Sequence, residues 1–183
     1  MKKAVVFLAD GFEEVEALTP IDMLRRASVE VTTVSIKESL DINGSHNIVV
    51  EADKLFEDVN YEEIDMFILP GGGLGTENLE NCDKLEKILI KANDDGKFIS
   101  AICAAPRVLG KLGFLKGHKA TCYPGNEKYL EGAEYEADAR AVTDGRFVTA
   151  RGMGTAIEFG SAVISQLLGE EKAREIEAQI QFR

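Results

Sequence analysis

The chain has 183 residues, of which 45% are hydrophobic and 29% are charged, so it is long enough for a full core and too apolar to be disordered. Its net charge of −11 repels phosphate backbones and anionic lipid surfaces, which argues against nucleic acid or a membrane as a general partner. We therefore expect a single domain spanning residues 1–183.

Apolar runs alternate along the chain with segments of helical period. Residues 4–8 predict a buried strand, and residues 15–27 predict a helix whose apolar positions are Val15, Leu18, Ile21 and Leu24. Further strands are predicted at residues 29–36, 66–69, 98–102, 119–123, 140–143 and 147–150, and further helices at residues 79–93, 155–168 and 170–180. The pair Asn43-Gly44 predicts a turn. This alternation predicts an α/β fold with a mostly parallel central sheet, whose site lies at the carboxyl ends of the strands.

The cysteines and the first residues indicate a reducing compartment. Lys2 and Lys3 precede an apolar run that is too short for a signal peptide, and no run approaches the length of a membrane span. Cys82, Cys103 and Cys122 are widely spaced and form no CxxC pair, which argues against a disulfide scaffold and a zinc site. We expect a cytoplasmic protein with free thiols and with no metal or organic cofactor.

Cys103 ends a predicted buried strand, directly before a predicted helical turn that contains Pro106. Ala101 and Ala105 flank it at two residues on either side, which is the small-x-nucleophile-x-small pattern of a nucleophile elbow. Free N–H groups and the dipole of the following helix would favour the thiolate. The alternative is a buried structural cysteine, the more common fate of a free cysteine.

Two further loops follow buried strands and are expected to converge on Cys103. Residues 70–75 read Pro-Gly-Gly-Gly-Leu-Gly, which matches neither the Walker nor the GxGxxG pattern and fits an oxyanion hole, or simply a tight turn. After the first strand, Glu16 lies one turn into a helix beside its apolar positions. A carboxyl group there would have a raised pKa and could donate a hydrogen bond to the sulfur, although most such glutamates are solvated.

Taken together, these loops resemble the ThiJ/PfpI superfamily, and within it the branch of the parkinsonism-associated deglycase. The resemblance is carried in family order by residues 11–16 with 20–22, by residues 69–75, by residues 101–106 and by residues 151–159. It implies a flavodoxin-like three-layer sandwich that forms a homodimer. It also implies that Cys103 is the reactive, oxidation-prone cysteine, that Glu16 hydrogen-bonds it, and that the N–H groups of Gly72 and Ala104 form an oxyanion hole.

The chain also departs from the patterns of this superfamily. The protease-like branch has a histidine directly after the cysteine, where this chain has Ala104. Some relatives have a histidine before the proline of a nearby loop, where this chain has Tyr123. The accessory candidates are therefore Tyr123, His46 in a segment that often meets the dimer partner, and Arg26, which either holds an anion near the site or is an ordinary cation at a helix C-terminus.

Three functions remain open on the sequence. The leading hypothesis is a cysteine-dependent glyoxalase or protein deglycase that acts on methylglyoxal or its adducts, either as the free carbonyl or on a glycated protein. The second is a redox-sensing stress-response protein or chaperone, in which Cys103 is oxidised and nothing is turned over. The third, an intracellular cysteine peptidase, is weakened by the residue at position 104.

Overall fold

The computed structural model describes residues 1–182 and confirms the predicted α/β fold, with a central sheet of seven strands. Their order across the sheet is β10-β11-β7-β6-β1-β2-β5. Neighbouring strands run parallel, except that β10 is antiparallel to β11. The strands are β1 (Lys3–Leu8), β2 (Glu30–Ser35), β5 (Lys54–Leu55), β6 (Met66–Leu69), β7 (Phe98–Ile102), β10 (Ala141–Asp144) and β11 (Phe147–Ala150).

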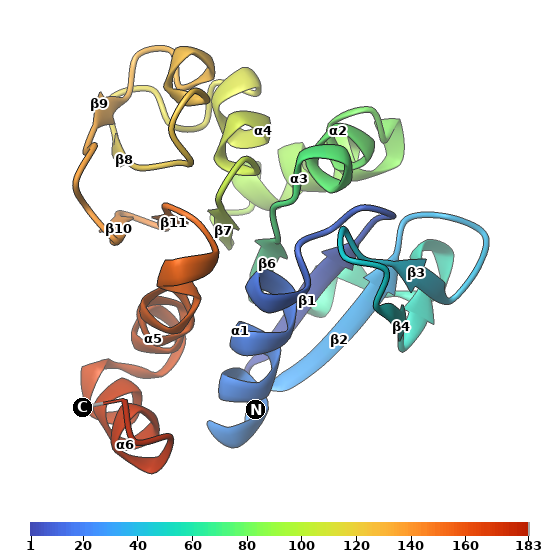
Figure 1. The fold of residues 1–183 in the computed structure, drawn as a ribbon, viewed down its shortest axis with the longest axis horizontal. Coiled ribbons are helices and arrows are strands. Elements are labelled where there is room, and N and C mark those ends of the chain that lie inside the picture. Colours follow the sequence, from blue (N-terminus) through green and yellow to red (C-terminus); the bar gives the residue numbers. More distant parts are fainter. Residues whose placement is uncertain (183) are drawn as a thin grey trace.

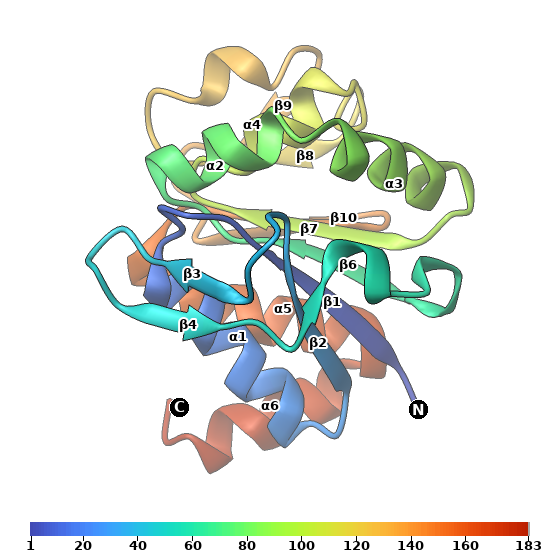
Figure 2. The same ribbon diagram turned by 90° about the vertical axis from the view of Figure 1, so that its right-hand side faces the viewer.

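Helices cover both faces of this sheet and make three layers (Figures 1 and 2). One face carries α1 (Glu14–Arg26), α5 (Ala156–Leu168) and α6 (Glu170–Gln179). The other carries α2 (Gly73–Glu80), α3 (Asp83–Asp94) and α4 (Pro106–Lys111). Among the described residues, no helix is both long and apolar enough to cross a membrane.

The core is divided into two apolar clusters by the sheet, and β1 shows how. Ala4, Val6 and Leu8 pack into the cluster under α1 and α5, whereas Val5 and Phe7 pack into the cluster under α3 and α4. Successive side chains of a strand point to opposite faces, so a strand covered on both sides is apolar at every position. This is why the central strands could be predicted as continuous apolar runs.

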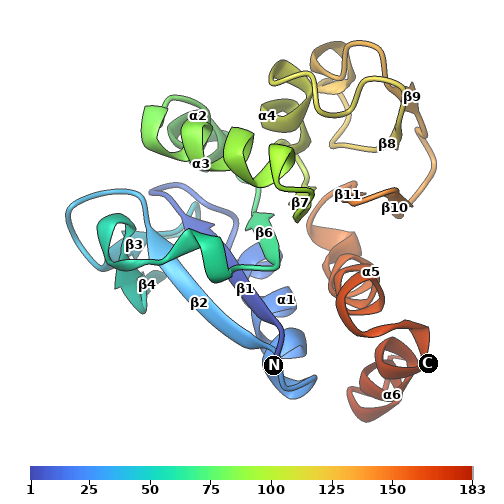
Figure 3. The same cartoon turned by 180° about the vertical axis from the view of Figure 1, so that it is seen from behind.

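Two of the predicted elements are wrong in extent. The helix predicted over residues 79–93 is two helices, because α2 begins at Gly73 and the extended backbone of Cys82 separates it from α3. The strand predicted over residues 119–123 is only β8 (Lys119–Ala120), which pairs with β9 (Glu134–Tyr135) outside the main sheet and beside α4 (Figure 3). The backbone beyond β8 is used otherwise, since the N–H of Tyr123 donates to the carbonyl of Cys103 at 2.7 Å.

A hairpin and four short 3-10 turns complete the fold. The hairpin joins β3 (Asp41–Asn43) to β4 (Val49–Glu51) through the turn predicted at Asn43-Gly44, where the N–H of Gly44 donates to the carbonyl of Ile48 at 2.9 Å. The 3-10 turns are η1 (Phe56–Asp58), η2 (Tyr61–Glu63), η3 (Glu127–Tyr129) and η4 (Met153–Thr155). The hairpin strands are too short and too exposed to have an apolar signature.

Candidate functional site

Cys103 occupies a strained elbow at the carboxyl end of β7. Its φ angle is +65°, in the left-handed region that residues other than glycine rarely adopt. Both sides of its peptide backbone are held, because its N–H donates to the carbonyl of Ala150 at 2.9 Å and its carbonyl accepts from Tyr123. The chain turns through Ala104 and enters α4 at Pro106, so the thiol stands between the strand end and a helix start.

Three groups from two other loops and from the elbow itself surround the sulfur of Cys103. The backbone N–H groups of Gly72 and Ala104 donate hydrogen bonds to the sulfur, and the carboxyl group of Glu16 hydrogen-bonds it from α1. These segments follow the carboxyl ends of the adjacent parallel strands β6, β7 and β1. The structure thus brings together four residues that are predicted from the sequence to form the site.

Glu16 lies on the buried face of α1, and of the apolar positions predicted for this helix Ile21 and Leu24 are buried with it, whereas Val15 and Leu18 are not. Val15 and Leu18 are 42% and 39% exposed, whereas Glu16 is 1% exposed. The carboxyl group is buried because it has partners there, since the N–H of Gly71 donates to its Oε2 at 3.1 Å and the N–H of Met153 donates to it as well. A buried polar group with such partners can stay in the core.

The glycine loop after β6 is what allows the dyad of Cys103 and Glu16 to form. A Cβ atom on Gly71 would lie 2.4 Å from Oε2 of Glu16 and 2.5 Å from Cβ of Cys103. A Cβ atom on Gly72 would lie 2.3 Å from the carbonyl oxygen of Gly11, and its φ is +92°. Gly71 was not predicted as a site residue, and its only signal in the sequence is membership of the glycine run.

Gly71→Ala is expected to push the Cys103 and Glu16 side chains apart and to destabilise the protein by about 2 kcal/mol through overpacking. The effect should appear as a lower urea midpoint of unfolding. Gly73→Ala is the matched control, because a Cβ atom there meets nothing within 4 Å. Equal stability of the two variants would contradict the tight approach of the three residues.

Burial controls the protonation of the dyad. Removal from water raises the pKa of Glu16 to about 7, against the opposing effect of its hydrogen bonds with Cys103 and with backbone N–H groups. Burial and the neighbouring Glu16 charge raise the pKa of the Cys103 thiol to about 12, against the opposing N–H groups of Gly72 and Ala104. The N–H groups at the elbow thus act in the predicted direction and favour the thiolate, whereas burial and the adjacent carboxylate act against it.

Tyr123 flanks the dyad. A Cβ atom on Gly152 would lie 3.3 Å from Cδ2 of Tyr123 and 3.9 Å from Oε1 of Glu16, so the ring stands at the edge of the site. Tyr123 and Met153 are both exposed.

Arg26 does not reach this site within the chain, since it ends α1 about 15 Å along the helix axis from Glu16. Its Nε instead donates to Asp22 at 2.6 Å.

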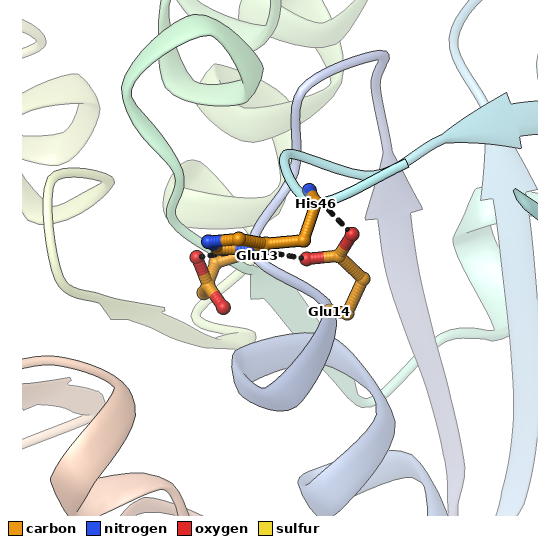
Figure 4. A group of neighbouring side chains, drawn as sticks. All are labelled: Glu13, Glu14 and His46. Atoms are coloured by element: carbon orange, nitrogen blue, oxygen red, sulfur yellow. Dashed lines mark hydrogen bonds and ion pairs between the residues drawn. The ribbon is translucent and has the colours of Figure 1, made fainter. Parts of the chain in front are cut away.

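His46 lies in a separate cluster with Glu13 and Glu14 (Figure 4). Its Nδ1 is 3.0 Å from Oε2 of Glu14 and 3.6 Å from Oε2 of Glu13. Ligand atoms of the three residues lie within 4.8 Å of one another, which is close enough to hold a metal ion. The Glu14 carboxylate is already satisfied by protein donors, however, including the N–H of His46 at 2.7 Å and the hydroxyl of Ser45 at 3.1 Å. These contacts therefore connect the start of α1 to the β3–β4 hairpin.

Glu14→Gln is expected to destabilise the protein by about 2 kcal/mol at neutral pH, because the buried carboxylate accepts several hydrogen bonds. The bonds from His46 and Ser45 outweigh the cost of burial and lower the pKa of Glu14 from 4.5 to about 2. A lowered folded-state pKa gives stability that is present above pH 4.5 and is lost as the pH falls towards 2. Urea unfolding of both proteins across this range should show the difference shrinking with falling pH, and a constant difference would contradict the assignment.

The chain is similar in sequence to a known protein family and to several of its members. The model of the DJ-1/PfpI family matches residues 2–166. Protein DJ-1 homolog B of Arabidopsis thaliana is 40% identical over all of this chain, which spans 42% of that protein. A protein of Pyrococcus abyssi named as a deglycase is 35% identical over 150 residues, which cover 81% of this chain and 89% of that protein.

Solved structures agree with these sequence relatives. Toxoplasma gondii DJ-1, described as oxidized, superposes with a TM-score of 0.94 at 35% identity, covering 99% of this chain and 98% of that one. Drosophila melanogaster DJ-1beta superposes with a TM-score of 0.93 at 34% identity, covering 98% and 97% of the two chains.

Proposed function

The chain belongs to the DJ-1/PfpI family, and from this premise we propose that it is a cysteine-dependent glyoxalase or protein deglycase that acts on methylglyoxal or its adducts. The observation that carries the proposal is the arrangement of three protein groups around the sulfur atom of Cys103. The Cys103 thiol is hydrogen-bonded to the Glu16 carboxyl group and faces the N–H groups of Gly72 and Ala104. A nucleophile, a proton carrier and an oxyanion hole are what addition to an aldehyde requires.

In the proposed first step, Sγ of Cys103 attacks the aldehyde carbon of methylglyoxal and a carbon–sulfur bond forms. The thiol proton passes to the Glu16 carboxylate, which the shared hydrogen bond positions for the transfer. The carbonyl oxygen becomes an oxyanion, and the N–H groups of Gly72 and Ala104 stabilise it as the sulfur loses its negative charge. Glu16 then returns the proton to this oxygen and leaves a hemithioacetal.

The remaining steps move two protons and add one water molecule. Glu16 takes the proton from the former aldehyde carbon and delivers it to the neighbouring carbon, while the hydroxyl proton of the hemithioacetal passes to the oxygen atom on that neighbouring carbon. The product is a lactate thioester on Cys103. Water then hydrolyses the thioester, so methylglyoxal and water give lactate and the free thiol returns. A deglycase would begin from the corresponding adduct on an amine and would release that amine.

The proposal is tested by steady-state conversion of methylglyoxal to lactate by the purified protein. Enzymes of ordinary efficiency have kcat values of about 1 to 10³ s⁻¹, and turnover well above the rate without protein supports the proposal. Absence of turnover with methylglyoxal and with a glycated model peptide would overturn it.

Redox sensing is the second candidate, and the same surroundings of Cys103 favour it. The donors that would hold an oxyanion would also hold the oxygen atoms of a sulfinate, with Glu16 donating from its protonated form. A sensor would gain two oxygen atoms at Cys103 at low peroxide while turning over no methylglyoxal. The peptidase alternative has no such support, because among the described residues the contacts of His46 and His118 are with Glu14 and Asp144 and neither histidine contacts Cys103.

We further propose a homodimer in the cytoplasm. Large apolar side chains are exposed on α1 at Val15 and Leu18, and on the adjoining hairpin at Ile48 and Val49. The contact between Glu14 and His46 joins these two elements, and a second copy that packs against both could bury the four side chains. Light scattering of the wild type and of Val49→Asp checks this: the variant should be monomeric, and an unchanged mass would place the interface elsewhere.

A further inference from the structure

The two N–H groups that face Cys103 lie just before two different helices. Gly72 directly precedes α2, and Ala104 lies two residues before α4. Both helices lie on the same face of the sheet, next to one another (Figure 1). The two donors point at one sulfur atom only while α2 and α4 keep their relative position.

A largely buried ion pair joins these two helices. Glu80 is the last residue of α2 and Arg107 lies in the first turn of α4, with Nε of Arg107 3.0 Å from Oε2 of Glu80. The contact is an ion pair without hydrogen-bond geometry at Nε. Their side chains are only 14% and 15% exposed, unlike most ion pairs of this chain. Lys111, one turn further along α4, contacts the other oxygen of Glu80.

The surroundings of Arg107 hold it in place. Its guanidinium group lies over the ring of Tyr129, 5.7 Å from the centroid, so the side chain is placed between α2 and η3. A cation in the first turn of a helix is unfavourable towards the helix dipole, so α4 itself gains nothing from an arginine there. The residue is better explained by the contact that it makes with Glu80.

We propose that the Glu80–Arg107 ion pair is a positioning contact, which holds the first turn of α4 against the end of α2 and keeps both N–H donors directed at Cys103. This inference rests on the proposed role of Cys103 as the nucleophile. Arg107 acts through the backbone of residues 103–105 and touches no reacting atom. Loss of the pair lets the two donors diverge while the apolar contacts of Leu79 and Val108 keep the helices folded.

The test measures alkylation of each cysteine by iodoacetamide at neutral pH, followed by peptide mass spectrometry on the full chain. Arg107→Met and Glu80→Gln should each slow alkylation of Cys103 about tenfold, since misplacement of a donor weakens thiolate stabilisation. Cys82 should react as in the wild type. The double variant should lose no more than Arg107→Met alone, and Arg107→Lys, which keeps the charge, should recover most of the rate.

Turnover gives a second readout that separates positioning from general damage. The kcat for methylglyoxal should fall about tenfold with KM nearly unchanged, because only the orientation of the donors is altered. Lys84→Met is the matched control, since it removes the exposed ion pair of Lys84 with Glu57 on neighbouring α3. Absence of methylglyoxal turnover in the wild type would contradict the proposed function alone, because alkylation of Cys103 still measures how the two N–H donors are positioned.

Wild-type alkylation of Cys103 in both Arg107→Met and Glu80→Gln would overturn the inference. Equal slowing at Cys82 and Cys103 would overturn it too, because the effect would then not be specific to the thiol that the two donors face. Faster alkylation of all three cysteines would indicate loss of the fold. Should Arg107→Met fail to fold, Glu80→Gln carries the test, as it changes no volume. Failure of both to fold would make the pair structural and would also contradict the proposal.

Discussion

Cys103→Ala is expected to lower kcat/KM for methylglyoxal by at least about 10³-fold, because every proposed covalent step passes through this sulfur. Cys103→Ser should lose nearly as much, since a hydroxyl group is a far weaker nucleophile and Glu16, with a pKa of about 7, is too weak a base to ionise it. Steady-state lactate formation by the three proteins at equal concentration measures the effect.

Cys82→Ser is the control for the effect of losing a thiol. Cys82 is partly exposed at the start of α3 and lies outside the dyad, so its replacement should leave kcat/KM unchanged. Residual turnover in Cys103→Ala within tenfold of the wild type would remove this residue from the chemistry, and with it the proposed mechanism.

Glu16→Gln is expected to lower kcat by about 10² to 10³-fold and to change the shape of the pH profile. In the wild type, activity should rise with pH through about 7, because the carboxylate form of Glu16 must accept the thiol proton. A thiolate beside a protonated Glu16 carries the same single charge, so either arrangement gives the same apparent pKa. Glutamine can keep a hydrogen bond to the sulfur but cannot accept the proton.

The profile of kcat/KM between pH 5 and pH 9 separates these roles. The variant should show no inflection near pH 7. Glu13→Gln serves as the comparison, because Glu13 contributes to the raised pKa of Glu16 by charge repulsion, and its removal should move the inflection to lower pH without abolishing it. Equal activity of Glu16→Gln and the wild type would exclude Glu16 as the acid or base.

The central strands were predictable because burial on both faces leaves uninterrupted apolar runs such as 66–69 and 98–102. The two terminal helices were predictable from the helical period of their sequence. The first turns of α2 were not, because Gly73 and Gly75 are poor helix formers and only tertiary contacts make them helical. The β3–β4 hairpin was missed for a similar reason. Its strands are three residues each and mostly exposed, so they carry no apolar alternation.

The candidate site was found from three short patterns, but two of its physical properties were hidden. The buried face of α1 includes Glu16 and excludes Val15, because the partners of the carboxyl group come from Gly71 and Met153, distant in sequence. The direction of the Cys103 pKa depends on how deeply the sulfur is buried, and sequence does not encode that depth. Arg107 had no signal at all, since its partner Glu80 is far from it along the chain.

The left-handed backbone of Cys103 sets activity against stability at one position. A residue with a Cβ atom in this conformation costs about 1 to 2 kcal/mol, and glycine would avoid that cost. Thermal unfolding should therefore show Cys103→Gly to be more stable than Cys103→Ala, although both lack the thiol. Selection for heat resistance alone would favour glycine here, so a cysteine at this position is accounted for by the proposed role of its sulfur as the nucleophile.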